Sequence, residues 1–129
     1  MSAAASVRAR YLSNGVTTAS PQQLLVMLYD RLALDLERAQ AALTAGDRTE
    51  AGSQLMHAQE IVLELRGSLQ VEMWDGGPRL AALYAWLLTE LVQANLKGDL
   101  RRVTDCRNIV EPLRDAWRQA AASLATTTA

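Results

Sequence analysis

The dipeptide Gly-Asp occurs twice, at Gly46-Asp47 and Gly98-Asp99, and each copy joins two amphipathic segments without a linker. Glycine readily takes the left-handed conformation that ends a helix, and an aspartate side chain accepts free amide hydrogens at the start of the next one. A chain that stops one helix and caps the next within two residues reverses direction there. The sequence therefore predicts two tight antiparallel turns between helices.

Other signals divide the rest of the chain. Ser20 is a strong N-cap, Pro21 suits the first helical position, and Gln23 completes a capping box with Ser20. Residues 1–19 show no sustained period and are expected to form an N-terminal arm. The run W-D-G-G-P at residues 74–78 is the strong break in the middle of the chain. These signals separate one arm and four helical segments.

Each of the four segments carries an apolar stripe with helical spacing. The second helix is expected to run to about Val71. The last stripe crosses Pro112, which removes a backbone hydrogen bond from a helix interior. We therefore expect an all-α, antiparallel up-and-down four-helix bundle over residues 20–124, with the last helix kinked near Pro112 or split into two collinear segments, and residues 125–129 frayed. The predicted core positions are Leu25, Leu28, Tyr29, Leu32, Leu36, Ala39 and Leu43; Ala51, Leu55, Ala58, Val62, Leu65 and Leu69; Leu80, Leu83, Tyr84, Leu87, Leu88, Leu91 and Asn95; and Val103, Cys106, Ile109 or Val110, Leu113, Trp117, Ala120 and Leu124.

Some apolar residues lie off these stripes. On the first two helices they lie opposite the core with a spacing of seven, and on the third helix a tryptophan points away from it: Met27 and Leu34, Met56 and Leu63, and Trp86. The repeated spacing indicates a second apolar seam, and methionine suits a surface that adapts to a partner. A bundle with such a seam can accept another amphipathic helix in a groove.

Besides Trp117, three polar or aromatic residues occupy core stripes. Asn95 is a candidate for a buried polar group that fixes helix register or contacts the backbone of a partner. Tyr29 and Tyr84 are expected at the edge of the core, with each hydroxyl reaching water or a backbone group.

The composition and the missing motifs exclude several function classes. The net charge of −1 over 129 residues argues against a nucleic-acid binder, and no stretch is apolar enough to span a bilayer. The N-terminus does not resemble a signal peptide, so a cytosolic location is expected. Neither a phosphate-binding loop, nor a nucleophile elbow, nor a zinc or di-iron pattern is present, and we expect no catalysis, metal or cofactor. The lone Cys106 is expected to be a buried small hydrophobe.

His57 is the only histidine. We expect it on the solvent side of the second helix, which is the geometry of a histidine phosphotransfer bundle. Such bundles usually follow the histidine with Lys and Gly, whereas Gln59 and Glu60 follow here, and Glu60 would repel a phosphate. An exposed histidine of no special role is the simpler interpretation.

Four stretches, taken in order, resemble one family. They are Y-L-S-N-G-V-T-T-A-S-P-Q-Q-L-L-V-M-L-Y-D at residues 11–30, A-Q-E-I-V-L-E-L at 58–65, L-Y-A-W-L-L-T-E-L-V-Q-A-N-L-K-G-D at 83–99, and L-R-D-A-W-R-Q-A at 113–120. Each is similar to the corresponding part of the flagellin export chaperone family FliS. The resemblance spans about residues 11–121, with compatible spacing.

The resemblance implies a non-enzymatic bundle of the bacterial cytosol. It implies binding of the C-terminal segment of flagellin in apolar grooves, which prevents premature polymerisation, and delivery to the export gate protein of the flagellar type III apparatus. It also implies an arm around Tyr11 that packs on the bundle and rearranges on binding. The expected partner-binding residues are Tyr11, Val16, Met27, Leu34, Met56, Leu63, Trp86 and Asn95. A phosphotransfer role for His57 and a generic helix-binding adaptor remain alternatives.

Overall fold

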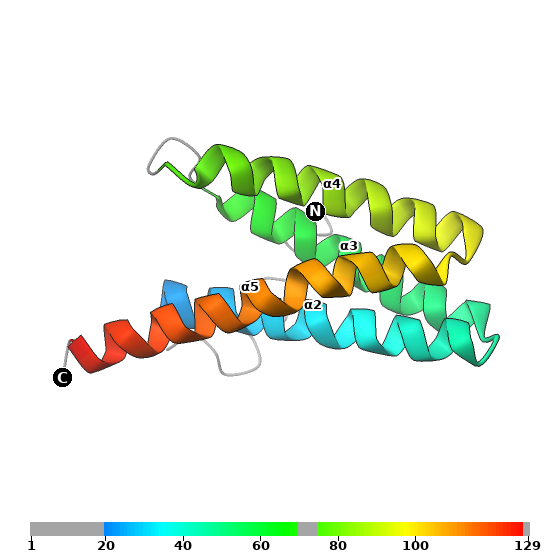
Figure 1. Ribbon diagram of the computed structural model, residues 1–129, viewed down its shortest axis with the longest axis horizontal. Helices are drawn as coiled ribbons and strands as arrows, with labels where there is room; N and C mark the ends of the chain where they lie inside the picture. The colour runs from blue at the N-terminus through cyan, green and yellow to red at the C-terminus, as the bar shows by residue number, and fades with distance from the viewer. Residues whose placement is uncertain (1–19, 70–74, 128–129) are drawn as a thin grey trace.

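The computed structural model describes residues 20–69 and 75–127, and within these ranges the chain forms four α-helices and no strand. The predicted all-α bundle is therefore confirmed. With the labels of Figure 1, the helices are α2 (Pro21–Thr44), α3 (Arg48–Ser68), α4 (Gly77–Lys97) and α5 (Leu100–Thr127). None of the described helices is both long and apolar enough to cross a membrane.

The helices begin and end with the capping hydrogen bonds and glycine conformations that the sequence predicts. The Ser20 hydroxyl accepts from the amide of Gln23 at 3.1 Å, and the Gln23 side chain accepts from the Ser20 amide at 2.9 Å. Gly46 and Gly98 have φ angles of +79° and +61°, the left-handed region that ends a helix at little cost for glycine. The Asp47 carboxylate then accepts from the amide of Glu50 at 3.0 Å. Both tight turns are thus confirmed.

The helices follow one another around the bundle. Helix α2 packs against α3 and α5, and α4 packs against α3 and α5. The two Gly-Asp turns lie at one end, which we call the closed end (Figure 1). From that end α4 and α5 diverge, so that the start of α4 and the end of α5 lie far apart in Figure 1. The opposite end of the bundle, the open end, therefore leaves parts of these helices without a helical neighbour.

The two tyrosines lie at the centre of the core and not at its edge. Tyr29 is fully buried, Tyr84 is almost fully buried, and their hydroxyl oxygens are 2.8 Å apart in a hydrogen bond. Desolvation raises the pKa of both phenols. The sequence-based expectation was wrong because each helix was considered alone, and the partner of each hydroxyl comes from another helix.

Other details differ from the predictions. Helix α3 ends at Ser68, three residues before the predicted end. Helix α5 is one element across Pro112 and not two segments, whereas a kink there stays a prediction. Of the two alternatives at the middle of α5, Val110 is buried and Ile109 is exposed. Ala120 and Leu124 are also exposed, since the last turns of α5 extend past the start of α2 (Figure 1).

Candidate partner-binding surfaces

The outward side of α4 is unusually free of charge. Between residues 80 and 96 the helix has one charged residue, Glu90. The exposed residues of this stretch are all uncharged: Ala82, Ala85, Trp86, Thr89, Val92 and Leu96. Leu96 is 69% exposed, the highest value among the large hydrophobic residues that the structure describes. A helix that carries apolar residues on its solvent side is a candidate for contact with another protein.

Met56 and Leu63, the two predicted residues on α3, lie next to the uncharged outward side of α4. A Cβ atom at Gly52 would be 3.3 Å from the Asn95 side chain, so Gly52 marks the side of α3 that faces α4. Met56 is one turn after Gly52, and Leu63 is two turns after Met56, which places both on that side. Val92 lies one turn before Asn95, and the antiparallel pairing brings it beside Met56. We call Met56, Leu63, Val92 and Leu96 the α3–α4 face.

Trp86 lies on the other side of α4. The Arg102 guanidinium of α5 forms an ion pair with Glu90 at 2.7 Å, which marks the side of α4 that faces α5. Trp86 is one turn before Glu90 and therefore shares this side, where it is 38% exposed. Ile109, two turns after Arg102, has the same exposed fraction on the facing side of α5. The divergence of the two helices leaves both side chains accessible.

The remaining predicted pair, Met27 and Leu34, lies on the side of α2 that is turned away from its core stripe. Met27 is one turn before Arg31, and Leu34 is next to Asp35, whose partner is on α3. Both apolar side chains are half-buried. Because Met56 and Leu63 lie on the α4 side of α3, the two predicted seven-residue repeats do not form one continuous groove.

A buried polar cluster occupies the contact between α2 and α3. The Asp35 carboxylate is fully buried, forms an ion pair with the Arg31 Nε at 3.0 Å, and contacts Nδ1 of His57 through its other oxygen. Desolvation raises the pKa of the Asp35 carboxyl, and the hydrogen bond from His57 partly offsets this. The prediction that His57 faces solvent was wrong, because its imidazole turns inward to this carboxylate and is 19% exposed.

Asn95 is half-buried at the closed end of the bundle. Its backbone carbonyl accepts from the Arg48 guanidinium at 3.2 Å, and the carbonyl of Leu96 accepts from the same group at 3.5 Å. Arg48 thereby satisfies two carbonyls at the end of α4, which have no partner within the helix. The Asn95 side chain faces Gly52 of α3, and its predicted contact with a partner stays a prediction.

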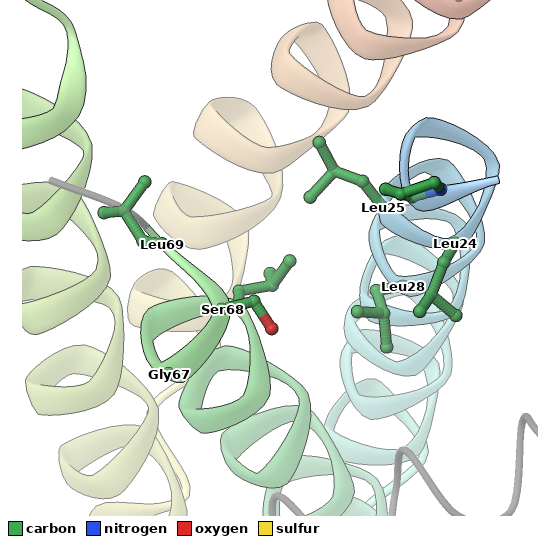
Figure 2. A pocket seen from close by; sticks show the side chains of 8 residues that line it. Leu24, Leu25, Leu28, Gly67, Ser68 and Leu69 are labelled. Carbon is green, nitrogen blue, oxygen red and sulfur yellow. The ribbon is translucent and has the colours of Figure 1, made fainter. Parts of the chain in front are cut away.

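An apolar cleft of about 510 Å³ lies at the open end, between the first turns of α2 and the last turn of α3. Figure 2 shows Leu24, Leu25 and Leu28 on one wall, with Ser68 and Leu69 opposite them. Sequence reasoning placed Leu25, Leu28 and Leu69 in the core and did not identify the cleft. Its opening depends on how far α2 and α3 separate, and no single-helix pattern reports that distance.

The remaining expectations from the sequence have the following outcomes. Tyr11 and Val16 lie outside the described residues. Burial raises the pKa of the Cys106 thiol to about 12, and the thiol therefore stays protonated at neutral pH. No group of three or more potential metal ligands occurs in the ranges that the structure describes. Sequence reasoning missed Val92 and Leu96, although their spacing of four opposite the Leu87–Leu91 stripe was a usable signal.

Comparisons with known proteins agree with this architecture. The family model described as "Flagellar protein FliS" matches residues 3–124. The flagellar secretion chaperone FliS of Bacillus subtilis is 33% identical over 110 residues, which cover 85% of this chain and 82% of the relative. The namesake of Salmonella typhimurium is 32% identical over 112 residues, with coverages of 84% and 82%.

A solved structure shows the same fold. The crystal structure of a bacterial flagellar chaperone superposes with a TM-score of 0.73 at 18% sequence identity, over 92% of this chain and 97% of that one. Together with the family match over nearly the whole chain and relatives above 30% identity, the conclusion is direct: this chain belongs to the FliS family of non-enzymatic flagellar secretion chaperones.

Proposed function

We propose that this protein acts in the cytoplasm as the export chaperone for flagellin. It binds the C-terminal segment of flagellin in apolar surface grooves, prevents premature polymerisation, and delivers the complex to the gate of the flagellar type III export apparatus. Family membership supports a chaperone role in flagellar export. The observation that carries the proposal beyond the family is the uncharged, partly exposed surface of α4 with Met56 beside it.

The size of this surface bears on how flagellin is held. Complete burial of an exposed leucine or methionine contributes about 1.5 to 3 kcal/mol. The four residues of the α3–α4 face are already partly covered, so that each adds about 1 kcal/mol and the face about 4 kcal/mol. Ordering a flexible segment costs about 2 to 5 kcal/mol, which cancels most of this gain. A flagellin segment therefore has to contact further surfaces.

Two further surfaces are suited to that role. The exposed Trp86 and Ile109 lie between α4 and α5, and the apolar cleft lies between α2 and α3 at the open end. A partner that reaches all three has to wrap around α4 or around the open end. We include Met27, Leu34 and the arm residues Tyr11 and Val16 among the proposed contacts.

Calorimetry with a synthetic peptide of the flagellin C-terminal segment tests the proposal. Met56→Asp and Leu96→Asp place a charge on the α3–α4 face at two exposed positions, where the folded chain tolerates it. We expect each to weaken binding about tenfold, since about 1.4 kcal/mol corresponds to a factor of ten. Asn108→Asp adds the same charge on the exposed surface of α5 and serves as the control. Wild-type affinity in both α3–α4 variants would remove this face from the proposed site.

Salt dependence distinguishes the proposal from an electrostatic mode of binding. Because the α3–α4 face contains no charged residue, the affinity should change less than threefold between 50 and 500 mM NaCl, conditions that screen exposed charges strongly. Co-purification from flagellated cells, with and without flagellin, separates the proposed chaperone from a generic helix-binding adaptor. Acid-labile phosphate on His57 would instead support the phosphotransfer alternative.

A further inference from the structure

Met56 is an exposed methionine on an apolar face of the bundle. It is 55% exposed, and helical spacing places it on the α3–α4 face, on the same side of α3 as Leu63 and next to Val92 of α4. Met27, the other methionine that the structure describes, is half-buried on α2. Exposure makes the thioether of Met56 accessible to dissolved oxidants, whereas Met27 is shielded by its surroundings.

We propose that Met56 is an oxidation site at which a hydroperoxide switches the α3–α4 face from apolar to polar. The sulfur attacks the terminal oxygen of the peroxide, the O–O bond breaks, and an S–O bond forms. Sulfur loses two electrons and becomes a sulfoxide, while the peroxide is reduced to water or an alcohol. Methionine sulfoxide reductases reverse the reaction with electrons from a dithiol.

The position of Met56 decides which state of the protein is affected. In the free chaperone the sulfoxide oxygen points to water and keeps its hydrogen bonds, so the fold is not destabilised. In a complex that covers the α3–α4 face, the same oxygen loses water and meets apolar side chains, a costly burial of a polar group. Oxidation should therefore weaken partner binding without unfolding the bundle. This consequence for flagellin rests on the proposed function, whereas the oxidation site itself does not.

The first test measures the site independently of any partner. Full-length protein is treated with graded hydrogen peroxide, and peptide mass spectrometry follows each methionine. We expect Met56 to be oxidised at least fivefold faster than Met27. Hydrophobic-interaction chromatography should show weaker retention of the oxidised protein. Met56→Leu, treated in the same way, should keep its retention, since it removes only this sulfur and leaves Met1, Met27 and Met73.

The second test measures the consequence. Calorimetry with the flagellin C-terminal peptide should give at least tenfold weaker binding after peroxide treatment of the wild type. Treated Met56→Leu should bind as untreated Met56→Leu does, and reductase treatment should restore the wild type. Equal oxidation rates for Met56 and Met27, or equal losses in Met56→Leu, would overturn the proposal. If the untreated protein fails to bind the peptide, the proposed function fails, while mass spectrometry and chromatography still decide the oxidation site.

Discussion

The hydrogen bond between Tyr29 and Tyr84 connects α2 with α4 through the centre of the bundle. Both rings are buried, and neither hydroxyl can exchange its partner for bulk water. Replacing one tyrosine by phenylalanine removes one hydroxyl and leaves the other one buried without its tyrosine partner. The expected cost in the free energy of unfolding is about 1 to 3 kcal/mol for each single variant, the usual penalty for an unsatisfied buried group.

The double variant has a different expectation. Tyr29→Phe with Tyr84→Phe removes both hydroxyls, so neither tyrosine hydroxyl is left without the other, and only the Trp117 side chain, which also hydrogen-bonds Tyr29, loses a partner. Two single costs of about 2 kcal/mol would add to about 4 kcal/mol, whereas the double variant should lose only about 1 to 2 kcal/mol. The predicted coupling energy between the two hydroxyls is therefore about 2 to 3 kcal/mol.

Urea unfolding followed by far-ultraviolet circular dichroism measures all four proteins. Helical signal reports the whole bundle and does not depend on the aromatic residues that are changed. The slope against urea concentration should remain constant across the set, which keeps the comparison on one two-state scale. Single effects that add to within about 0.5 kcal/mol in the double variant would refute the reasoning, since they would mean that the hydroxyls do not depend on one another.

Three further predictions concern other parts of the bundle. Gly98→Ala should lower the free energy of unfolding by about 1 kcal/mol more than Gly46→Ala does. Both glycines have positive φ, but only a Cβ at Gly98 would collide with the Arg48 guanidinium, 2.6 Å away, and break its hydrogen bonds to the end of α4. Urea unfolding of the two variants measures the difference, and equal losses would contradict the prediction. Because the pKa of Asp35 is raised in the folded state, its contribution to stability is complete below the ordinary pKa of 3.8 and is lost as the pH rises through the folded pKa. The free energy of unfolding of the wild type relative to Asp35→Asn, measured in urea at several pH values, should therefore fall with rising pH in that window. A rise would show that the interactions with His57 and Arg31 outweigh desolvation. Val110→Ala should cost about 2 kcal/mol and Ile109→Ala less than about 0.5 kcal/mol in thermal or urea unfolding, since only the valine is buried.

The helix boundaries were predictable because their causes are local. The capping box at Ser20, the glycine at each tight turn and the aspartate after it act within one helical turn, and the structure uses each of them as predicted. The end of α3 at Ser68 was predicted less well. Its apolar stripe continues through Leu69 without a strong stop signal, so the pattern alone leaves the boundary undetermined by a few residues.

Contacts between side chains of two helices could not be predicted from the residue pattern of either helix alone. Asp35 sits between Leu34 and Leu36, four residues after its ion-pair partner Arg31, and nothing in this local sequence indicates that it is fully buried. Its burial is tolerated because His57, at the matching position along the bundle axis on α3, supplies a hydrogen bond. A helical wheel of α3 alone places His57 toward solvent. The contact with Asp35 can be predicted only when the rotation of α2 about its own axis is also known.

The candidate partner-binding surfaces also depend on contacts between helices that residue spacing on one helix does not predict. A seven-residue spacing identified Met56 and Leu63 as apolar residues away from the core, and Met27 and Leu34 by the same rule, but spacing does not tell which neighbour a helix turns toward. That choice is made by contacts between helices: Gly52 against Asn95 turns one side of α3 to α4, and His57 against Asp35 turns the opposite side to α2. Met56 and Leu63 consequently share a face with Val92 and Leu96, whereas Met27 and Leu34 adjoin charged groups. If binding follows apolar exposure, charge substitutions on the α3–α4 face should weaken the complex more than the same substitutions at Met27 or Leu34.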